Sequence, residues 1–432
     1  MSRKTQSYLF TTFEAGGVVA PMLTIARRLL NRGHHVRVMS DNCNRAECEA
    51  AGATFVPWTR APSRPGRERE FDTFEDWKGP PPEGFMAFMQ AVLVGPALAH
   101  AEDTIEELRR EPADLVVCNE MLFGPQVGCE AIGQKFALVG VNVPVFPIPG
   151  VPPFGPGFAP AKTPEEAAMH AEVGKAVLGL FDMALPMLNA ARVALGLGTL
   201  EHLVDQHKRA EHLLMATSRA FDFAPETLPP RMTYIGPQLG DPGWAQPWTS
   251  PFAADDARPL VLVSFSTTFQ NHVGGLQRAI DALDGLQLRA LVTLGGPVDA
   301  SEFTAPSNVV LVDSAPHQQV MAQAALVVTH GGHGTVCKAL VNGLPQLILP
   351  HGRDQGDNAV RITERGAGLS LPADAGVEAI RAAISRLIDE PAFTAAARQL
   401  GAKVAREAEQ SPVTEILEGL AGCGENGGRA AA

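Results

Sequence analysis

The stretch LVVTHGGHGTVCKALVNGLPQLILP, residues 326–350, decides the fold of the second half of the chain. A β-branched run ends at His330, three glycines follow within four residues, and a helical pattern runs from about Thr335 to Gly343. This order delivers a helix N-terminus to the carboxyl edge of a sheet, where free backbone N–H groups and the helix dipole favour a phosphate. The imidazole of His330 and the hydroxyl of Thr335 can donate to the same anion. By spacing alone, a tight turn with Thr335 as the helix N-cap explains the stretch equally well.

Two further polar motifs follow strands of the same predicted sheet. The loop PHGRDQGDN, residues 350–358, offers Asp354 and Gln355, an adjacent pair with the acceptors and the donor that bind vicinal sugar hydroxyls. The run VLVSFSTTFQ, residues 261–270, opens from a buried strand into a hydroxyl cluster, Ser266-Thr267-Thr268. A solvated loop and a helix N-cap are the structural alternatives for these two motifs.

The same alternation of strand and helix extends over the whole chain. Strands are predicted at Ser7–Phe13, Val36–Met39, Asp114–Cys118, Phe136–Val143, Pro259–Phe265, Leu288–Leu294, Asn308–Asp313, Leu326–His330 and Gln346–Pro350. Strands separated by helices of this length indicate an α/β fold with two doubly wound parallel sheets, and a cleft between them is a natural ligand site. We expect an N-terminal domain at 1–222, a Pro-rich linker at 223–258, a C-terminal domain at 259–422 and a disordered tail at 423–432.

Composition excludes several classes of protein. The 432 residues, 45% of them hydrophobic, suffice for two domains. A net charge of −12 argues against a nucleic-acid or anionic membrane surface. The six cysteines lack paired metal-ligand spacing, so no metal site is expected and reduced thiols in the cytoplasm are the simpler interpretation. No apolar run reaches about 18 residues, so no membrane insertion is expected.

The run HGGHGT followed by GLPQLILPHGRDQGDN is similar to the nucleotide-sugar signature of glycosyltransferase family one. That family includes plant glucosyltransferases and bacterial enzymes that glycosylate macrolides and other natural products. The resemblance implies the GT-B fold, two Rossmann-like domains facing a central cleft. It also implies inverting transfer of a hexose from UDP-glucose or a dTDP-sugar, with neither a metal nor another cofactor. The chain contains no Asp-x-Asp sequence that could bind a metal on the diphosphate, which agrees with metal-independent transfer.

The resemblance also assigns residues to the donor. His330 and the turn after it would hold the diphosphate, Thr267 would contact it from the opposite side, and Asp354 and Gln355 would read the sugar hydroxyls. The full expected donor-binding set is Ser266, Thr267, His317, His330, Gly332, His333, Gly334, Thr335, Asp354 and Gln355.

Three positions depart from the family pattern. Ser314 stands where many members place an aromatic residue that stacks on the base, and Lys338 stands where many UDP-users carry a ribose-binding glutamate. Uridine and deoxythymidine donors therefore both stay open. The usual catalytic histidine of the first loop is replaced by Val18, and its aspartate partner aligns with Asn119.

Two carboxylates remain as candidate bases, Glu14 in the loop TTFEAGGVVAPM (residues 11–22) and Glu120 after a later strand. Either could accept the proton of an acceptor hydroxyl. Each also has a structural interpretation, Glu14 as a loop charge or cap and Glu120 as an exposed strand-end residue. Glu14 is slightly favoured because its loop occupies the family's base position.

The acceptor is expected to be a small apolar molecule with a hydroxyl group. The segment Phe85–Leu98 and the Pro/Phe-rich loop 144–160 supply apolar walls, although most of these residues could equally be core. A nucleotide-sugar epimerase or hydrolase of the same fold, and a degenerate paralogue that binds and activates a partner, are the alternatives. A homodimer is left open. A dinucleotide oxidoreductase is disfavoured because AGGVVA lacks the G-x-G-x-x-G spacing.

Overall fold

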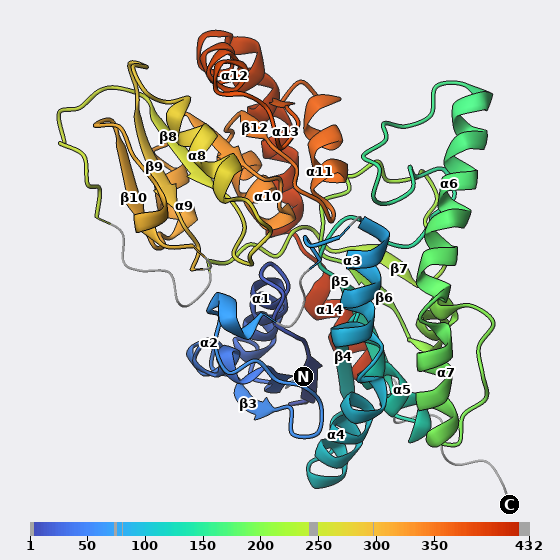
Figure 1. The fold of residues 1–432 in the computed structure, drawn as a ribbon. Coiled ribbons are helices and arrows are strands. Elements are labelled where there is room, and N and C mark those ends of the chain that lie inside the picture. The colour runs from blue at the N-terminus through green and yellow to red at the C-terminus, as the bar shows by residue number, and fades with distance from the viewer. Residues whose placement is uncertain (1–3, 73–75, 80, 242–248, 297, 423–432) are drawn as a thin grey trace, which may run out of the picture.

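The computed structural model describes residues 4–72, 76–79, 81–241, 249–296 and 298–422. Two parallel sheets, each covered by helices on both faces, form two domains that lie side by side (Figure 1). The predicted α/β fold with two doubly wound sheets is confirmed. The expected disordered tail at 423–432 lies outside the described residues.

The N-terminal sheet has seven parallel strands in the order β3-β2-β1-β4-β5-β6-β7. Its central strand β1 pairs with β2 and β4 on either side, so that Tyr8 lies opposite both Val36 and Leu115. The three central residues of the run SYLFT, Tyr8 to Phe10, are apolar and buried because both faces of a central parallel strand are covered. The strands are β1 Ser7–Thr11, β2 His35–Ser40, β3 Thr54–Pro57, β4 Leu115–Asn119, β5 Phe136–Gly140, β6 Leu213–Met215 and β7 Met232–Tyr234.

Close helix packing in this domain depends on two glycines of one helix. A Cβ atom at Gly124 or Gly128 would come within 2.8 Å of a backbone carbonyl oxygen of the neighbouring helix, at Ala97 and Ala101 respectively. These two helices, α4 and α5, therefore approach more closely than side chains would permit. The helices of the domain are α1 Val19–Leu30, α2 Arg45–Ala50, α3 Pro81–Phe88, α4 Ala97–Arg110, α5 Phe123–Ala131, α6 Pro164–Asp182 and α7 Leu185–Ala194.

The C-terminal sheet has six parallel strands in the order β10-β9-β8-β11-β12-β13. The strands are β8 Leu260–Ser264, β9 Arg289–Thr293, β10 Val309–Val312, β11 Leu326–Thr329, β12 Gln346–Ile348 and β13 Gly368–Ser370. The helices are α8 Val273–Asp281, α9 His317–Met321, α10 His333–Val341, α11 Gln355–Thr363, α12 Val377–Asp389, α13 Pro391–Glu409 and α14 Val413–Gly422.

The strand order of each sheet reverses once, and the reversals position the site. In the N-terminal sheet the chain switches direction between β1 and β4, and in the C-terminal sheet between β8 and β11. Ligands of open α/β sheets bind outside the carboxyl ends of strands at such a switch point. The loops that follow these four strands carry most of the predicted site residues.

The structure departs from the expected domain boundaries in two places. Strand β7 lies within the segment 223–258, which we expected to be a linker, and it extends the N-terminal sheet. Helix α14 packs against the N-terminal domain, where Glu418 accepts from Arg32 at 3.0 Å and lies 2.9 Å from Nε2 of His34. The last helix therefore returns to the first domain, because its apolar face completes that domain's core.

The signature helix begins earlier than the sequence predicts. Helix α10 starts at His333 with Gly332 as its N-cap, so Thr335 lies in the first turn and is not the cap. The chain turns sooner because Gly331 adopts a φ of 100°, where a Cβ atom would also lie 2.7 Å from Ile348.

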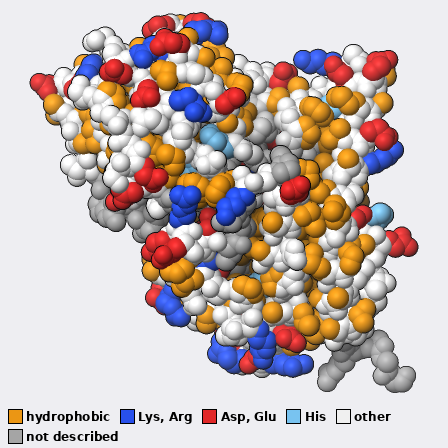
Figure 2. All heavy atoms as spheres, viewed as in Figure 1, with side chains coloured by type: hydrophobic (Ala, Val, Ile, Leu, Met, Phe, Trp, Pro, Cys, Tyr) orange, Lys and Arg blue, Asp and Glu red, His pale blue; other side chains and the backbone are white. Residues whose placement is uncertain are grey.

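Among the described residues, the stretch Pro82–Arg110, which includes α4, has the length and hydropathy of a membrane span, and the bent pair α6–α7 does so as a unit. Within that stretch, α4 is packed against α5, as a core helix would be. Hydrophobic side chains gather over the side of the N-terminal domain that carries these helices (Figure 2), and Met169, Met183 and Val193 are exposed there. The expectation that the chain does not insert into a membrane stays a prediction.

Candidate active site between the two sheets

A cleft of about 1140 Å³ lies between the domains and is lined by loops from both. All of the candidate residues named from the sequence line this one cleft, the two carboxylates from the N-terminal side and the donor set from the C-terminal side. Residues as far apart in sequence as Glu14 and Gln355 therefore meet at one site. The catalytic or donor-binding role of each residue stays a prediction. The hydrogen bonds that each side chain already makes indicate whether it is available to a substrate.

The first loop fits against the hydroxyl cluster of the other domain. Gly16 has a φ of 78°, and a Cβ atom there would lie 2.6 Å from Oγ1 of Thr267. The glycine pair of this loop thus permits a close approach that any side chain would block. This contact brings the first loop to the predicted phosphate-binding threonine.

The turn after β11 presents the start of α10 to the cleft. Gly332 leads into the helix, so the N–H groups of its first turn have no partners within the helix and can meet an anion. The His330 ring lies over this turn, with Nε2 at 2.8 Å from where a Cβ of Gly332 would stand. Burial, together with the nearby charges of His272 and His351, lowers the pKa of His330 to about 3. His330 is therefore a neutral N–H donor at physiological pH.

Two other predicted histidines are held by hydroxyl groups. Nε2 of His333 lies 2.8 Å from Oγ1 of Thr217, which belongs to the N-terminal domain. Nε2 of His317 lies 3.2 Å from Oγ of Ser264 and 3.3 Å from Oγ1 of Thr293. Burial lowers the pKa of each ring to about 4. Both rings line the cleft uncharged, and His333 also joins the two domains.

The two residues of the predicted sugar-binding pair differ: Gln355 holds the loop together, whereas Asp354 is accessible from the cleft. Gln355 is buried; its Oε1 accepts from the backbone N–H of His351 at 2.6 Å, and its Nε2 donates to Gln270 at 2.8 Å. Asp354 precedes α11 and is only partly buried, and its Oδ2 accepts from Asn358 at 2.9 Å. Asp354 is therefore the better placed of the two to meet a sugar hydroxyl.

The hydroxyl cluster is organised around Ser266. Its Oγ accepts from the backbone N–H of Thr268 at 3.2 Å and from Nε2 of Gln270 at 2.6 Å. Oγ1 of Thr268 in turn accepts from Nη1 of Arg353 at 2.9 Å. Ser266 thus shapes the loop, while Thr267 is the member that faces Gly16 and the cleft.

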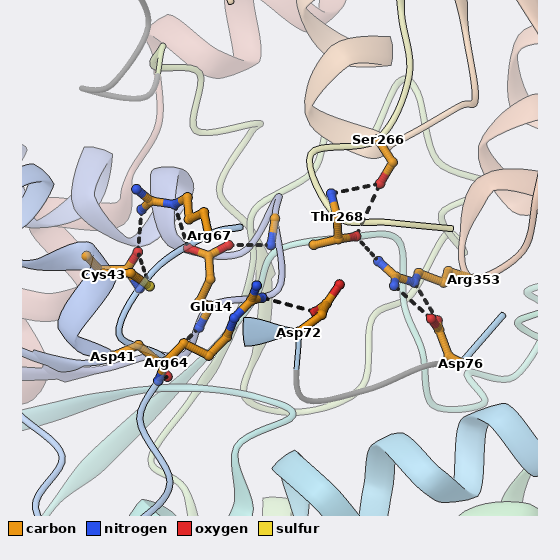
Figure 3. A network of polar contacts seen from close by, with 12 residues as sticks. Glu14, Asp41, Cys43, Arg64, Arg67, Asp72, Asp76, Ser266, Thr268 and Arg353 are labelled. Atoms are coloured by element: carbon orange, nitrogen blue, oxygen red, sulfur yellow. Dashed lines mark hydrogen bonds and ion pairs between the residues drawn. The ribbon is translucent and has the colours of Figure 1, made fainter. Parts of the chain in front are cut away.

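The carboxylate of Glu14 forms hydrogen bonds that stabilise its own loop (Figure 3). Its Oε1 accepts from the backbone N–H of Gly16 at 2.7 Å, and its Oε2 accepts from Nε of Arg67 at 3.2 Å. Its own backbone N–H donates to Asp41 at 2.8 Å, and Arg67 also pairs with Glu47 at 2.7 Å. Because both carboxylate oxygens already accept hydrogen bonds, Glu14 is poorly placed to take a further proton. The slight preference for Glu14 is not supported by these contacts.

Glu120 has the environment of a general base. It directly follows β4 in a buried position, and desolvation raises the pKa of its carboxyl group to about 7. Its backbone carbonyl accepts from Nε2 of Gln126 at 2.9 Å and from Nε2 of His207 at 2.8 Å, which fixes the main chain. Within the described ranges, no ion pair neutralises this carboxylate. A carboxyl group that titrates near neutral pH and lines a cleft suits proton transfer.

The positions of the family's usual dyad have other uses here. Val18 stands at the start of α1, and Oδ1 of Asn119 accepts from the backbone N–H of Met121 at 3.0 Å. Asn119 thereby shapes the turn that contains Glu120. Neither side chain can act as a base.

Sequence reasoning named Lys338 as a departure from the family pattern but missed the two arginines of the cleft, Arg67 and Arg353. Arg353 forms two contacts with Asp76 of the N-terminal domain, Nε to Oδ2 at 2.7 Å and Nη2 to Oδ1 at 3.0 Å (Figure 3). Lys338 donates to Asp241 at 2.7 Å. Arg353 could have been noted from its place beside Asp354 in the motif, whereas nothing in the sequence pairs it with Asp76.

The N-terminal side of the cleft carries an aromatic wall. Phe85 and Phe181 make an edge-to-face contact with ring centroids 4.9 Å apart. Such walls favour flat or apolar ligands. The phenylalanines that line the cleft on this side are Phe13, Phe85, Phe88, Phe154 and Phe181. Over the described part of the chain, no three His, Cys, Asp or Glu side chains gather as metal ligands would.

Comparisons with known proteins agree with this geometry. Residues 279–420 match the family described as erythromycin biosynthesis protein CIII-like, C-terminal domain. The chain is 26% identical to 4'-demethylrebeccamycin synthase of Lentzea aerocolonigenes, over 95% of this chain and 99% of that protein. It is 38% identical to aklavinone 7-beta-L-rhodosaminyltransferase of Streptomyces galilaeus over 38% of each chain. The solved glycosyltransferase of kitacinnamycin has the same fold, with a TM-score of 0.71 and 21% identity over 97% of this chain and 100% of that one.

Proposed function

We propose that this chain, a glycosyltransferase of the GT-B fold with a C-terminal domain like that of erythromycin biosynthesis protein CIII, moves a hexose from a nucleoside diphosphate to an apolar acceptor. The transfer inverts the anomeric centre and needs no metal. One observation carries the proposal: the buried carboxyl group of Glu120 and the open N-terminus of α10 line the same cleft from opposite domains.

The donor diphosphate binds at the start of α10. The first-turn N–H groups, the neutral N–H of His330 and the hydroxyl of Thr267 supply hydrogen bonds there, and the helix dipole adds to them. Preorganised donors of this kind stabilise the negative charge that grows on the leaving diphosphate. Asp354 receives the sugar hydroxyls, and Gln355 holds the loop in place. UDP-glucose and a dTDP-sugar are both candidates, because Lys338 is paired with Asp241 where many UDP-users have a carboxylate.

Glu120 takes the proton of the acceptor hydroxyl. The acceptor oxygen attacks the anomeric carbon from the face opposite the diphosphate, the sugar–phosphate bond breaks, and the proton passes to the carboxylate. A positioned base contributes about 10²–10⁴-fold to such a step. The aromatic wall of the N-terminal domain holds an apolar acceptor against this group.

The proposal is tested by comparing Glu120→Gln with Glu14→Gln at saturating donor. We expect Glu120→Gln to lower kcat at least about tenfold, within the range for a lost base, with donor affinity unchanged. In the wild-type enzyme, kcat/KM should rise with pH through about 7 as Glu120 ionises, and this limb should vanish in the variant. Glu14→Gln should keep the limb, since its effect would come through the shape of its loop.

A thermal-shift screen of UDP- and dTDP-sugars identifies the donor, since selective binding stabilises the fold. Activity should persist in EDTA. If Glu120→Gln retained both the wild-type rate and the pH profile, Glu120 would not be the base. If no nucleotide sugar stabilised the chain, the alternative of a degenerate partner-binding paralogue would replace the proposal.

A further inference from the structure

The donor diphosphate carries negative charge, and the histidines around its proposed position supply no positive charge to balance it. Burial lowers the pKa values of His317, His330 and His333 to about 4, 3 and 4, so these rings are neutral. Among the residues that the structure describes, the lysine and arginine side chains that line the cleft are Arg67, Lys338 and Arg353. Each of the three is paired with a carboxylate in this structure.

Two of these cations have fixed structural partners. Arg67 lies between Glu14 and Glu47, both from its own domain, and it holds the first loop. Lys338 lies within α10 and pairs with Asp241, which also accepts from the backbone N–H of Gln318 at 3.2 Å. Displacing either cation would undo contacts that shape the cleft.

Arg353 differs from Arg67 and Lys338 in that it contacts the hydroxyl cluster beside the proposed phosphate position. Its Nη1 donates to Thr268, the neighbour of Thr267, and its charge contributes to lowering the pKa of His330. Arg353 therefore lines the same cleft as both proposed phosphate contacts, Thr267 and His330. Its guanidinium is a planar fork, which matches the oxygens of a phosphate as well as those of a carboxylate.

The backbone at Arg353 also indicates a use for this side chain. Its φ of 55° lies in the left-handed region, which costs free energy for any residue other than glycine. Such a conformation persists where the surrounding contacts fix it, and Arg353 is fixed by Thr268 and Asp76. In this structure that side chain reaches across the cleft to Asp76.

Asp76 can leave Arg353 without dismantling its own segment. Trp77, next to it, packs edge-to-face on Phe269 with ring centroids 5.1 Å apart. The guanidinium of Arg69 lies 3.4 Å from the centroid of the same Phe269 ring. These contacts hold Trp77 and Arg69 against Phe269 of the C-terminal domain independently of the ion pair.

We propose, on the premise of the function above, that Asp76 occupies the place of the donor diphosphate, and that Arg353 exchanges its carboxylate for the diphosphate when the donor binds. Arg353 then stabilises the leaving group directly. Asp76 acts as a competing anion that keeps the guanidinium paired while the site lacks donor. Binding of the donor therefore also loosens one link between the two domains.

The test measures the affinity for UDP and dTDP by calorimetry. Arg353→Ala should weaken binding at least about tenfold, because it removes a charge-assisted fork. Asp76→Asn should tighten binding about two- to fivefold, because it removes a competing anion from a partly exposed ion pair. In the Arg353→Ala background, Asp76→Asn should have no effect.

Two controls separate this exchange from other causes. Glu70→Gln makes the same charge change at an exposed position of the same segment and should leave affinity unchanged. Uridine and thymidine, which lack the diphosphate, should bind wild type and Asp76→Asn equally. Thermal melting reports whether each variant is folded, and Asp76→Asn alone remains decisive if Arg353→Ala fails to fold.

Tighter diphosphate binding by Asp76→Asn, abolished without Arg353, supports the exchange. Weaker or unchanged binding by Asp76→Asn, or unchanged binding by Arg353→Ala, overturns it while leaving the proposed function intact. If the wild-type chain bound neither UDP nor dTDP, the proposed function would fail and this inference with it.

Discussion

The carboxylate of Glu120 fits against Gly140, which ends the neighbouring strand β5. A Cβ atom at Gly140 would lie 2.8 Å from Oε1 and 2.9 Å from Oε2 of Glu120. The space for the buried carboxyl group therefore exists because residue 140 has no side chain. Burial of this carboxyl group is in turn what raises its pKa to about 7. The chemistry proposed for Glu120 thus depends on the absence of a side chain at residue 140.

Gly140→Ala should therefore impair turnover without touching the donor site. The added methyl group would push the carboxylate toward the cleft, and even a small misplacement of a base is costly. We expect kcat to fall about tenfold or more with unchanged nucleotide affinity. Steady-state kinetics and calorimetry check this, with Gly198→Ala as a control, because a Cβ there meets nothing within 4 Å. Full activity of Gly140→Ala would mean that the position of Glu120 is unimportant.

Glu120→Gln should change stability in a pH-dependent way. The pKa of Glu120 is raised from 4.5 to about 7 in the folded chain, so the folded state binds this proton more tightly than the unfolded state. Its contribution is therefore fully present below about pH 4.5 and is lost as pH rises through about 7. At about 1.4 kcal/mol per pKa unit, the loss is on the order of 3 kcal/mol.

Glutamine is neutral and escapes this penalty. We expect Glu120→Gln to melt above the wild-type protein at pH 8 and to approach it toward pH 5, as measured by thermal denaturation across pH. A variant that melts below wild type at pH 8 would contradict the buried, unpaired state assigned to this carboxylate.

His330→Ala should weaken diphosphate binding modestly. The ring is neutral because burial lowers its pKa to about 3, so it offers a neutral hydrogen bond to the anion. Loss of such a bond costs about two- to tenfold in affinity. The ratio of wild-type to variant affinity should stay constant between pH 6 and 8. A ratio that grows toward pH 6 would indicate an imidazolium ion, and a ratio of one would remove His330 from the donor site.

The sheets and the edge that carries the site follow from the sequence, for physical reasons. Central parallel strands such as β1 and β11 present apolar residues to both faces of their sheet. The loops after their carboxyl ends contain Gly16 and Gly331, which have positive φ angles that favour glycine. Short or terminal elements are different. The three residues of β7, and the helix α14, owe their places to surfaces of distant elements, which no local pattern reveals.

Local sequence also does not show which of the two candidate bases, Glu14 or Glu120, is free of an ion pair. Glu14 and Glu120 both follow strands of the N-terminal sheet and both are buried. What separates them is Arg67, which lies 53 residues beyond Glu14 and pairs with it alone of the two. The ion pair between Arg353 and Asp76 is likewise a contact between loops of different domains. Such pairings depend on how loops fold back, and loop composition does not specify that.

Asp354 and Gln355, which the sequence predicts to be one sugar-binding pair, should respond differently to substitution. Gln355 is buried and links the backbone of His351 to Gln270, so its loss should disturb the loop itself. Asp354 is partly exposed to the cleft, and within the described part of the chain Asn358 is the one side chain that donates to it. We expect Gln355→Ala to lower both thermal stability and nucleotide affinity, because buried partners are left unsatisfied.

Asp354→Ala should instead lower kcat/KM for the sugar donor while free UDP or dTDP binds nearly as before. Asp354→Asn is the matched variant, since it keeps an acceptor oxygen and should retain more activity than alanine. Calorimetry with the free nucleotide and kinetics with the full donor distinguish the two residues. Equal losses of stability and nucleotide affinity at both positions would show that Asp354 also serves the loop, and the sugar hydroxyls would then need another acceptor.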